Sequence, residues 1–96
     1  MSRHRTHRAD GNQGEIVTAL RATGHSVLIL SQVGGGAPDL LAARAKTMAL
    51  LEVKVPGEEL STEQIIWRSN NDGFRVYVVR SPQEAIDAMS DAIRRS

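Results

Sequence analysis

Two short apolar stretches separated by only a few residues, at 39–44 and 48–54, constrain the fold of this chain more than any other feature. The first reads Asp-Leu-Leu-Ala-Ala-Arg and the second Met-Ala-Leu-Leu-Glu-Val-Lys. Because so few residues connect them, we expect two strands that form an antiparallel hairpin. The second strand ends on an acid and a base after a nearly continuous apolar run, and this polar end requires an explanation.

The segments on either side of the hairpin alternate between helical and strand patterns. Residues 10–23 place Ile16, Ala19 and Leu20 on one helical face, and residues 26–31 read as a short buried strand. Ser61 with Gln64 forms a capping box that opens a helix ending near residue 71. A fourth strand follows at 74–80.

A second capping box, Ser81 with Glu84 and a proline between them, opens the last helix. The element order is therefore α-β-β-β-α-β-α. The last strand is reached by a crossover, so we expect it to run parallel to a neighbour. These features predict an α/β fold with a central mixed four-stranded sheet flanked by helices.

The length of 96 residues allows one domain, which we place at 10–96, after a basic N-terminal arm at 1–9. The arm carries Arg3, His4, Arg5, His7 and Arg8, and it is expected either to contact phosphates or to be a solvated terminus. The absence of cysteine excludes disulfides and Cys-ligated zinc. No segment resembles a signal peptide or a membrane span, so a cytoplasmic protein is expected, in a bacterial or phage-infected cell.

The polar end of the hairpin can form a metal site. If the turn is centred between Ala45 and Lys46, Asp39 lies directly opposite Glu52, and like charges at that distance are destabilising. A divalent cation such as Mg²⁺ or Mn²⁺ removes the penalty, because both prefer carboxylate oxygens. A register shifted by one residue would place Val53 opposite Asp39 instead and remove the site.

Lys54 lies two residues after Glu52 and therefore projects from the same face of the strand. A lysine beside the metal can orient the attacking water and offset the charge of a phosphate. The alternative is a surface salt bridge at a strand end. The position of Pro38 and Asp39 at hairpin distance, behind the glycine-rich residues 34–36, favours a catalytic site for phosphodiester hydrolysis.

Pro38-Asp39, twelve intervening residues and then Glu52-Val53-Lys54 resemble the motif of the PD-(D/E)XK nucleases. The chain is most similar to the VRR-NUC branch of that superfamily, which includes small standalone phage domains. The resemblance covers roughly residues 11–89 and continues through Pro56, Gly57, Leu60, Ser61, Gln64, Trp67, Gly73, Phe74, Val76, Val78, Val79, Arg80 and Ser81. It implies a restriction-endonuclease-like core.

The resemblance also implies roles for individual residues. Asp39, Glu52 and the backbone carbonyl of Val53 would be the metal ligands, and Lys54 the catalytic lysine. Gln64 matches a glutamine that the family places near the site, in addition to its capping role. Family members carry an acidic residue on the first helix, for which Glu15 is the candidate; its alternative is a solvated glutamate.

The function implied is that of an Mg²⁺- or Mn²⁺-dependent DNA endonuclease that acts on branched DNA, including four-way (Holliday) junctions. Because symmetrical cleavage of two strands needs two active sites, we expect a homodimer. The alternatives are a nickase or flap-type nuclease, and a non-catalytic nucleic-acid-binding module with the same fold.

Other residues remain open between a functional and a structural role. Trp67 and Tyr77 could stack on bases, although core or subunit interface is the stronger interpretation for Trp67. Arg68, Arg75 and Arg80 are either phosphate contacts or solvated charges. The glycines at 34–36 form either an approach to the site for DNA or a plain loop.

Overall fold

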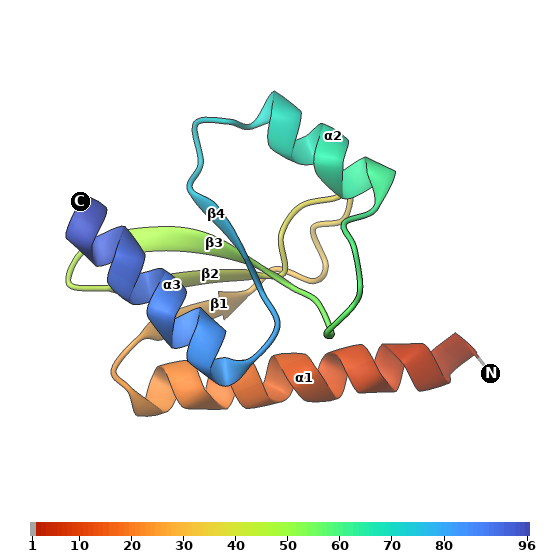
Figure 1. Ribbon diagram of the computed structural model, residues 1–96, viewed down its shortest axis with the longest axis horizontal. Coiled ribbons are helices and arrows are strands. Elements are labelled where there is room, and N and C mark those ends of the chain that lie inside the picture. The colour runs from red at the N-terminus through yellow and green to blue at the C-terminus, as the bar shows by residue number, and fades with distance from the viewer. Residues whose placement is uncertain (1) are drawn as a thin grey trace.

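A computed structural model describes the backbone of residues 2–96 and the side chains of residues 12–96. Four strands form one sheet in the order β1-β2-β3-β4, and three helices accompany it (Figure 1). The expected element order and the mixed sheet are confirmed. The elements are α1 Ser2–Ala22, β1 Ser26–Ile29, β2 Leu40–Arg44, β3 Thr47–Val53, α2 Thr62–Asn70, β4 Val76–Val79 and α3 Pro82–Arg95.

Helices α1 and α3 pack together over one face of the sheet, which we call the inner face (Figure 1). Alternate strand residues point into this layer, because successive side chains of a strand lie on opposite faces. Leu40 on β2 and Leu51 on β3 are fully buried here and pack with apolar residues of the two helices. The core consists of Ile16, Val17, Leu20, Val27, Leu40, Ala42, Ala49, Leu51, Val79, Ala85, Ala88, Met89 and Ala92.

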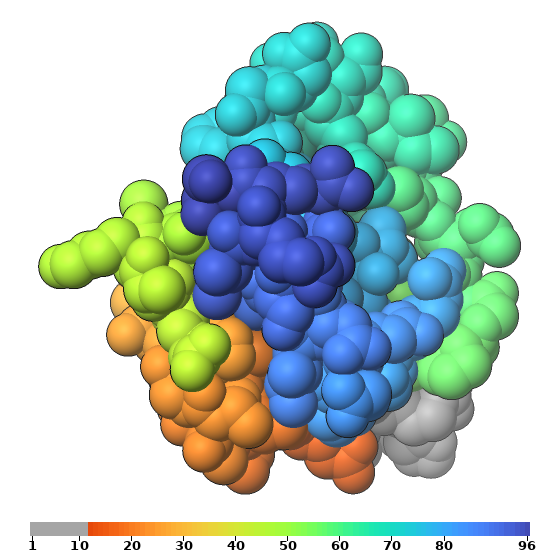
Figure 2. Space-filling model, turned by 60° about the vertical axis from the view of Figure 1, so that its left-hand side comes forward, coloured from red at the N-terminus to blue at the C-terminus, as the bar shows by residue number. Residues whose placement is uncertain are grey.

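The β2–β3 hairpin has the register that the metal-site hypothesis assumed. Leu40 pairs with Leu51 and Arg44 with Thr47, so the two turn residues are Ala45 and Lys46. Both have positive φ angles, 54° and 64°, as a type I′ turn requires. The tip of the hairpin projects from the surface beside α3 (Figure 2).

Strand β4 pairs with β3 in the parallel direction, as expected from the crossover through α2. Leu50 is paired with Val76 and Glu52 with Val78. These pairs place β3 between β2 and β4, so that β3 is fully inside the sheet. Unlike α1 and α3, helix α2 stands away from the sheet body and contains no buried residue (Figure 1).

Several boundaries differ from the expected ones. The first helix begins at Ser2 rather than at residue 10, because Asp10 and Gly11 continue the helical backbone instead of capping it. The side chains of the basic arm, including His4 and His7, lie outside the described residues. Strand β1 ends at Ile29, and β4 spans only Val76–Val79, which pair with residues 50–53 of β3.

The two helix caps also differ from each other. At α2 the Ser61–Gln64 capping box is complete. At α3 the Ser81 hydroxyl accepts from the N–H of Glu84 at 3.1 Å, but the Glu84 carboxylate accepts from the N–H of Arg80 at 2.8 Å instead of that of Ser81. The expected second capping box is therefore only half formed.

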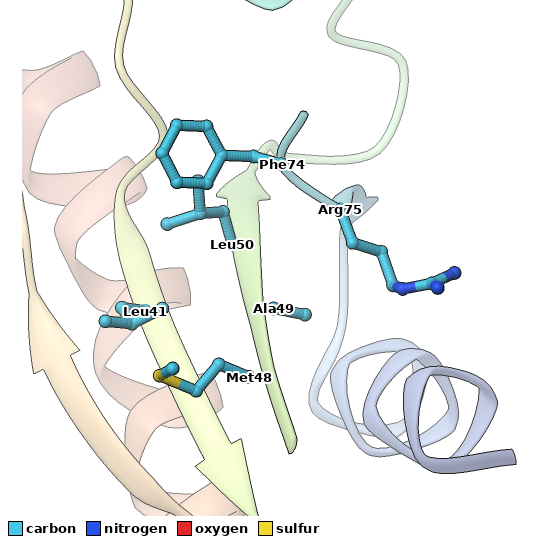
Figure 3. A pocket seen from close by; sticks show the side chains of 6 residues that line it. All are labelled: Leu41, Met48, Ala49, Leu50, Phe74 and Arg75. Atoms are coloured by element: carbon cyan, nitrogen blue, oxygen red, sulfur yellow. The ribbon is translucent and has the colours of Figure 1, made fainter. Parts of the chain in front are cut away.

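The face of the sheet opposite α1 and α3, the outer face, is partly uncovered and apolar. Leu28 of β1 and Met48 of β3 point outward and are 61% and 62% exposed. A hollow of about 170 Å³ lies on this face (Figure 3). Leu41, Met48, Ala49, Leu50, Phe74 and Arg75 line it. No helix in the described part of the chain is long and apolar enough to cross a bilayer.

Candidate active site

Asp39 and Glu52 face each other at the end of the hairpin. Their positions continue the register set by Leu40 and Leu51, and the N–H of Asp39 donates to the Leu51 carbonyl at 3.1 Å. One carboxylate oxygen of Asp39, Oδ2, accepts from the N–H of Val53 at 2.8 Å. The backbone of β3 therefore fixes the Asp39 side chain beside Glu52, as the assumed register required.

The Glu52 carboxyl is buried, with only 3% of the residue exposed. The pKa of Glu52 is raised from 4.5 to about 8, chiefly by burial and also by a hydrogen bond to Asp39 and the negative charge of Asp39. The positive charges of Lys54 and Arg68 oppose this shift. Two acids held this closely favour a shared proton or a shared cation over two free charges.

Lys54 lies on the same outer face and is 7% exposed. Its N–H donates to the Val79 carbonyl at 3.0 Å, and its own carbonyl accepts from Nδ2 of Asn12 on α1 at 3.0 Å. The ammonium lies 3.6 Å from Oε2 of Glu58. The main chain of this lysine is therefore held from two sides, and its side chain has one carboxylate partner.

Sequence reasoning missed Asn12 and Glu58. An amide that binds a main-chain carbonyl 42 residues away leaves no side-chain pattern in a sequence. Glu58 lies four residues after Lys54, but without a helix at this point the spacing alone does not predict an ion pair.

Gln64 of α2 caps its helix and also contacts the carboxylate pair. Its Oε1 atom accepts from the N–H of Ser61 at 2.8 Å and so completes the helix cap. Its Nε2 atom donates to Oε2 of Glu52 at 3.2 Å. The glutamine therefore ties the start of α2 to the carboxylate pair.

Glu15 is exposed on α1 and does not join this pair in a larger acidic cluster. Within the part of the chain whose side chains are described, no group of three His, Cys, Asp or Glu side chains is placed to hold a metal. Two facing carboxylates still fit Mg²⁺ or Mn²⁺, because such cations are commonly bound through one or two carboxylates with water and substrate phosphate. The carbonyl oxygen of Val53 follows Glu52 directly in the chain.

The glycine-rich loop before β2 is packed against α2. A Cβ atom on Gly36, whose φ is +86°, would lie 2.5 Å from the carbonyl oxygen of Glu63. The loop therefore needs glycine here for close approach to the first turn of α2, in addition to any contact with substrate.

Trp67 and His25 have structural environments. Trp67 is half-buried and stacks on Phe74, with 5.9 Å between the ring centroids. His25 is buried, and its Nδ1 atom lies 3.1 Å from both the Leu20 carbonyl and the Thr23 hydroxyl at the end of α1. These contacts account for both side chains without a ligand.

Comparison with known proteins places these features in a family. The model of the VRR-NUC domain matches residues 5–83. A solved structure described as a VRR_NUC domain superposes with a TM-score of 0.65 at 23% identity, over 85% of this chain and 94% of the other. No curated protein matches the sequence. The structural match supports the expected fold, and the family model covers the residues from which the site is built.

Proposed function

We propose that this chain, which belongs to the VRR-NUC domain family, is an Mg²⁺- or Mn²⁺-dependent endonuclease acting on DNA. The family is one of nuclease domains, and the fold agrees with that assignment. The observation that carries the proposal is the facing pair of Asp39 and Glu52, with the buried Lys54 on the same side of the sheet. A purely structural role gives no reason to gather a half-buried carboxylate, a buried carboxyl and a buried lysine at one place.

In this proposal Asp39 and Glu52 hold the cation, with the Val53 carbonyl as a further ligand. The cation polarises the phosphate and favours deprotonation of water. Lys54 orients the attacking water and offsets charge on the phosphate. Its main chain is held by hydrogen bonds through the carbonyl and the N–H. Its ammonium can leave Glu58 and bind the substrate phosphate. Gln64 orients Glu52 through its 3.2 Å hydrogen bond. Glu15 is an additional ligand only if α1 or the substrate brings it closer.

We also propose that the enzyme is a homodimer whose subunits meet through the outer face. Leu41 and Leu50 are paired across the hairpin, next to the carboxylate pair on the same face of the sheet. They line the apolar hollow shown in Figure 3. Apolar surface of this kind is typical of protein contacts, whereas DNA-binding surfaces are polar and basic. Ile65 and Ile66 of α2, each 54% exposed, extend the apolar surface available to a second copy.

Two active sites in one dimer suit a substrate in which two strands are cut, and we propose branched DNA such as the four-way junction. This preference rests on the family resemblance and on the two-site argument. A nickase or flap-type activity needs only one site and is the outcome expected of a monomer.

The proposal is tested by incubating the protein with labelled four-way junction, flap and linear duplex DNA in Mg²⁺, Mn²⁺ or EDTA. Paired, metal-dependent cuts in the junction that disappear in Lys54→Ala are expected. Metal-dependent cleavage of another substrate would correct the specificity alone. Binding of junctions without cleavage under any metal would identify a non-catalytic module.

The dimer is tested by sedimentation of the wild type, Met48→Lys and Ser90→Lys. Met48 is 62% exposed on the outer face, whereas Ser90 is exposed on α3 at the other side of the molecule. We expect a dimer that Met48→Lys dissociates and Ser90→Lys does not. A wild-type monomer at micromolar concentration would refute this part of the proposal.

A further inference from the structure

Helix α2 turns two polar residues inward beside its tryptophan and turns two isoleucines outward, unlike an ordinary surface helix. Its half-buried positions are Gln64, Trp67 and Arg68, which follow the i, i+3, i+4 spacing of one helical face. Ile65 and Ile66 point outward and are each 54% exposed. A helix present only to cover a core would turn its isoleucines inward. The inward polar residues therefore need a functional explanation.

The position of the inward face is fixed by Gln64, which donates to Oε2 of Glu52. Arg68 lies one turn further along the same face, because residues four apart on a helix are neighbours. Arg68 is half-buried on this face, as Gln64 is. The side of α2 that carries Arg68 is therefore the side that meets the carboxylate pair.

The Arg68 guanidinium also has no ion-pair partner among the side chains that the structure describes. Among the side chains of residues 12–96, it forms no ion pair within 4.0 Å, although other arginines of the chain, Arg94 and Arg95, pair with Asp91. A half-buried arginine normally uses its planar set of donors on a carboxylate or a phosphate. Glu52 is engaged with Asp39 and Gln64 and does not provide that acceptor at bonding distance.

We propose that Arg68 is a phosphate-binding residue of this nuclease, whose guanidinium donates to the non-bridging oxygens of the scissile phosphate or of its neighbour. This inference rests on the proposed function. The phosphate is then held between Lys54 on the sheet and Arg68 on the helix. The contact also explains why the arginine lies on the inward side of α2.

The experiment compares Arg68→Gln and Arg68→Lys with Arg94→Gln, a matched change at a 70% exposed arginine of α3. Junction binding is measured in EDTA over a range of salt concentrations, and single-turnover cleavage is measured in Mg²⁺. Arg68→Gln is expected to lower the cleavage rate by about 10- to 100-fold. It should also reduce the slope of log binding constant against log salt by about 1, the value for one phosphate contact.

Arg68→Lys should keep the salt slope of DNA binding, because the positive charge remains. It should lose most of the cleavage rate, because an ammonium cannot form the two parallel hydrogen bonds of a guanidinium to a phosphate. Arg94→Gln should behave as the wild type in both measurements. Circular dichroism establishes whether each variant is folded. If Arg68→Gln does not fold, the rate and salt slope of Arg68→Lys decide whether Arg68 binds phosphate.

A wild-type rate and salt slope in Arg68→Gln would overturn the inference while leaving the nuclease intact. If the wild type cleaves no DNA, the proposed function fails, but the salt slope of binding still decides whether Arg68 contacts phosphate. A protein that neither binds nor cleaves DNA overturns both.

Discussion

Replacement of Glu52 by glutamine should stabilise the metal-free protein and abolish its activity. Glutamine has the shape of a protonated glutamate, so its oxygen can still accept from Gln64 and its NH₂ group can donate to Asp39. The change removes only the buried negative charge. We therefore expect a folded variant that lacks one of the two acidic ligands.

The size of the effect follows from the pKa of Glu52, which rises from 4.5 to about 8 on folding. Between these two pH values the folded state holds a proton that the unfolded state has released, so the wild type loses stability as the pH rises from 4.5 through about 8. The favourable contribution is complete below 4.5 and absent above 8. At about 1.4 kcal/mol per pH unit the upper bound is about 5 kcal/mol, and sharing of the proton with Asp39 reduces the expected value to about 2–3 kcal/mol.

The assay is urea or thermal denaturation in EDTA at pH 5, 7 and 9, followed by circular dichroism. The free-energy advantage of Glu52→Gln should grow by about 2–3 kcal/mol between pH 5 and pH 9, which is roughly 10–20 °C in Tm for a domain of this size. Glu59→Gln, on the exposed loop before α2, controls for the chemical change itself. An advantage that is the same at all three pH values, or a wild type more stable than the variant at pH 9, would refute the argument.

Further changes test the metal, the loop and the core. Addition of Mg²⁺ at 100 times its Kd should raise the wild-type free energy of unfolding by about 2.7 kcal/mol, and EDTA should reverse the gain. The gain should be smaller at lower pH, because protons compete with the metal for the carboxylates. A calorimetric scan in which Mg²⁺ does not shift the Tm would contradict this prediction. Gly36→Ala should lower the free energy of unfolding in urea by about 1–3 kcal/mol and lower the activity, because the added Cβ would meet the Glu63 carbonyl. Gly14→Ala is the control: its Cβ would have nothing within 4 Å, and it should stabilise α1 by about 0.5–1 kcal/mol. Leu51→Ala, at a fully buried position, should lower the free energy of unfolding by about 2–5 kcal/mol in the same assay. Val33→Ala, at a 65% exposed position, should lower it by less than about 0.5 kcal/mol. Equal losses in the two variants would contradict the described core.

The fold was predictable from the sequence wherever apolar pattern and chain length left one choice. The hairpin itself was predictable, whereas its register rested on an assumed turn centre between Ala45 and Lys46, with which the pairing of Leu40 and Leu51 agrees. The turn residues themselves carry no such signal, since Ala45 and Lys46 adopt positive φ without being glycine or asparagine. Long-range burial, rather than the local preference of the turn, therefore decides the register.

The start of α1 and the orientation of α2 could not be predicted in the same way. Asp10 is a good cap by residue type, but the structure continues the helix through it to Ser2. Hydrophobic periodicity would turn Ile65 and Ile66 toward the sheet, and the structure turns them away. In α2 the polar contact between Gln64 and Glu52 accompanies an orientation opposite to the apolar rule.

The hairpin turn lies at the far end of both strands from the carboxylate pair, with five paired positions between them. Any change that lengthens or shortens both strands equally leaves Asp39 facing Glu52, because pairing near the site is unchanged. A single deletion in one strand would instead exchange the two faces of that strand and place an apolar side chain in the site. The number of residues between the two acids is therefore free to differ among proteins that share this centre, in steps of two, whereas their pairing is not.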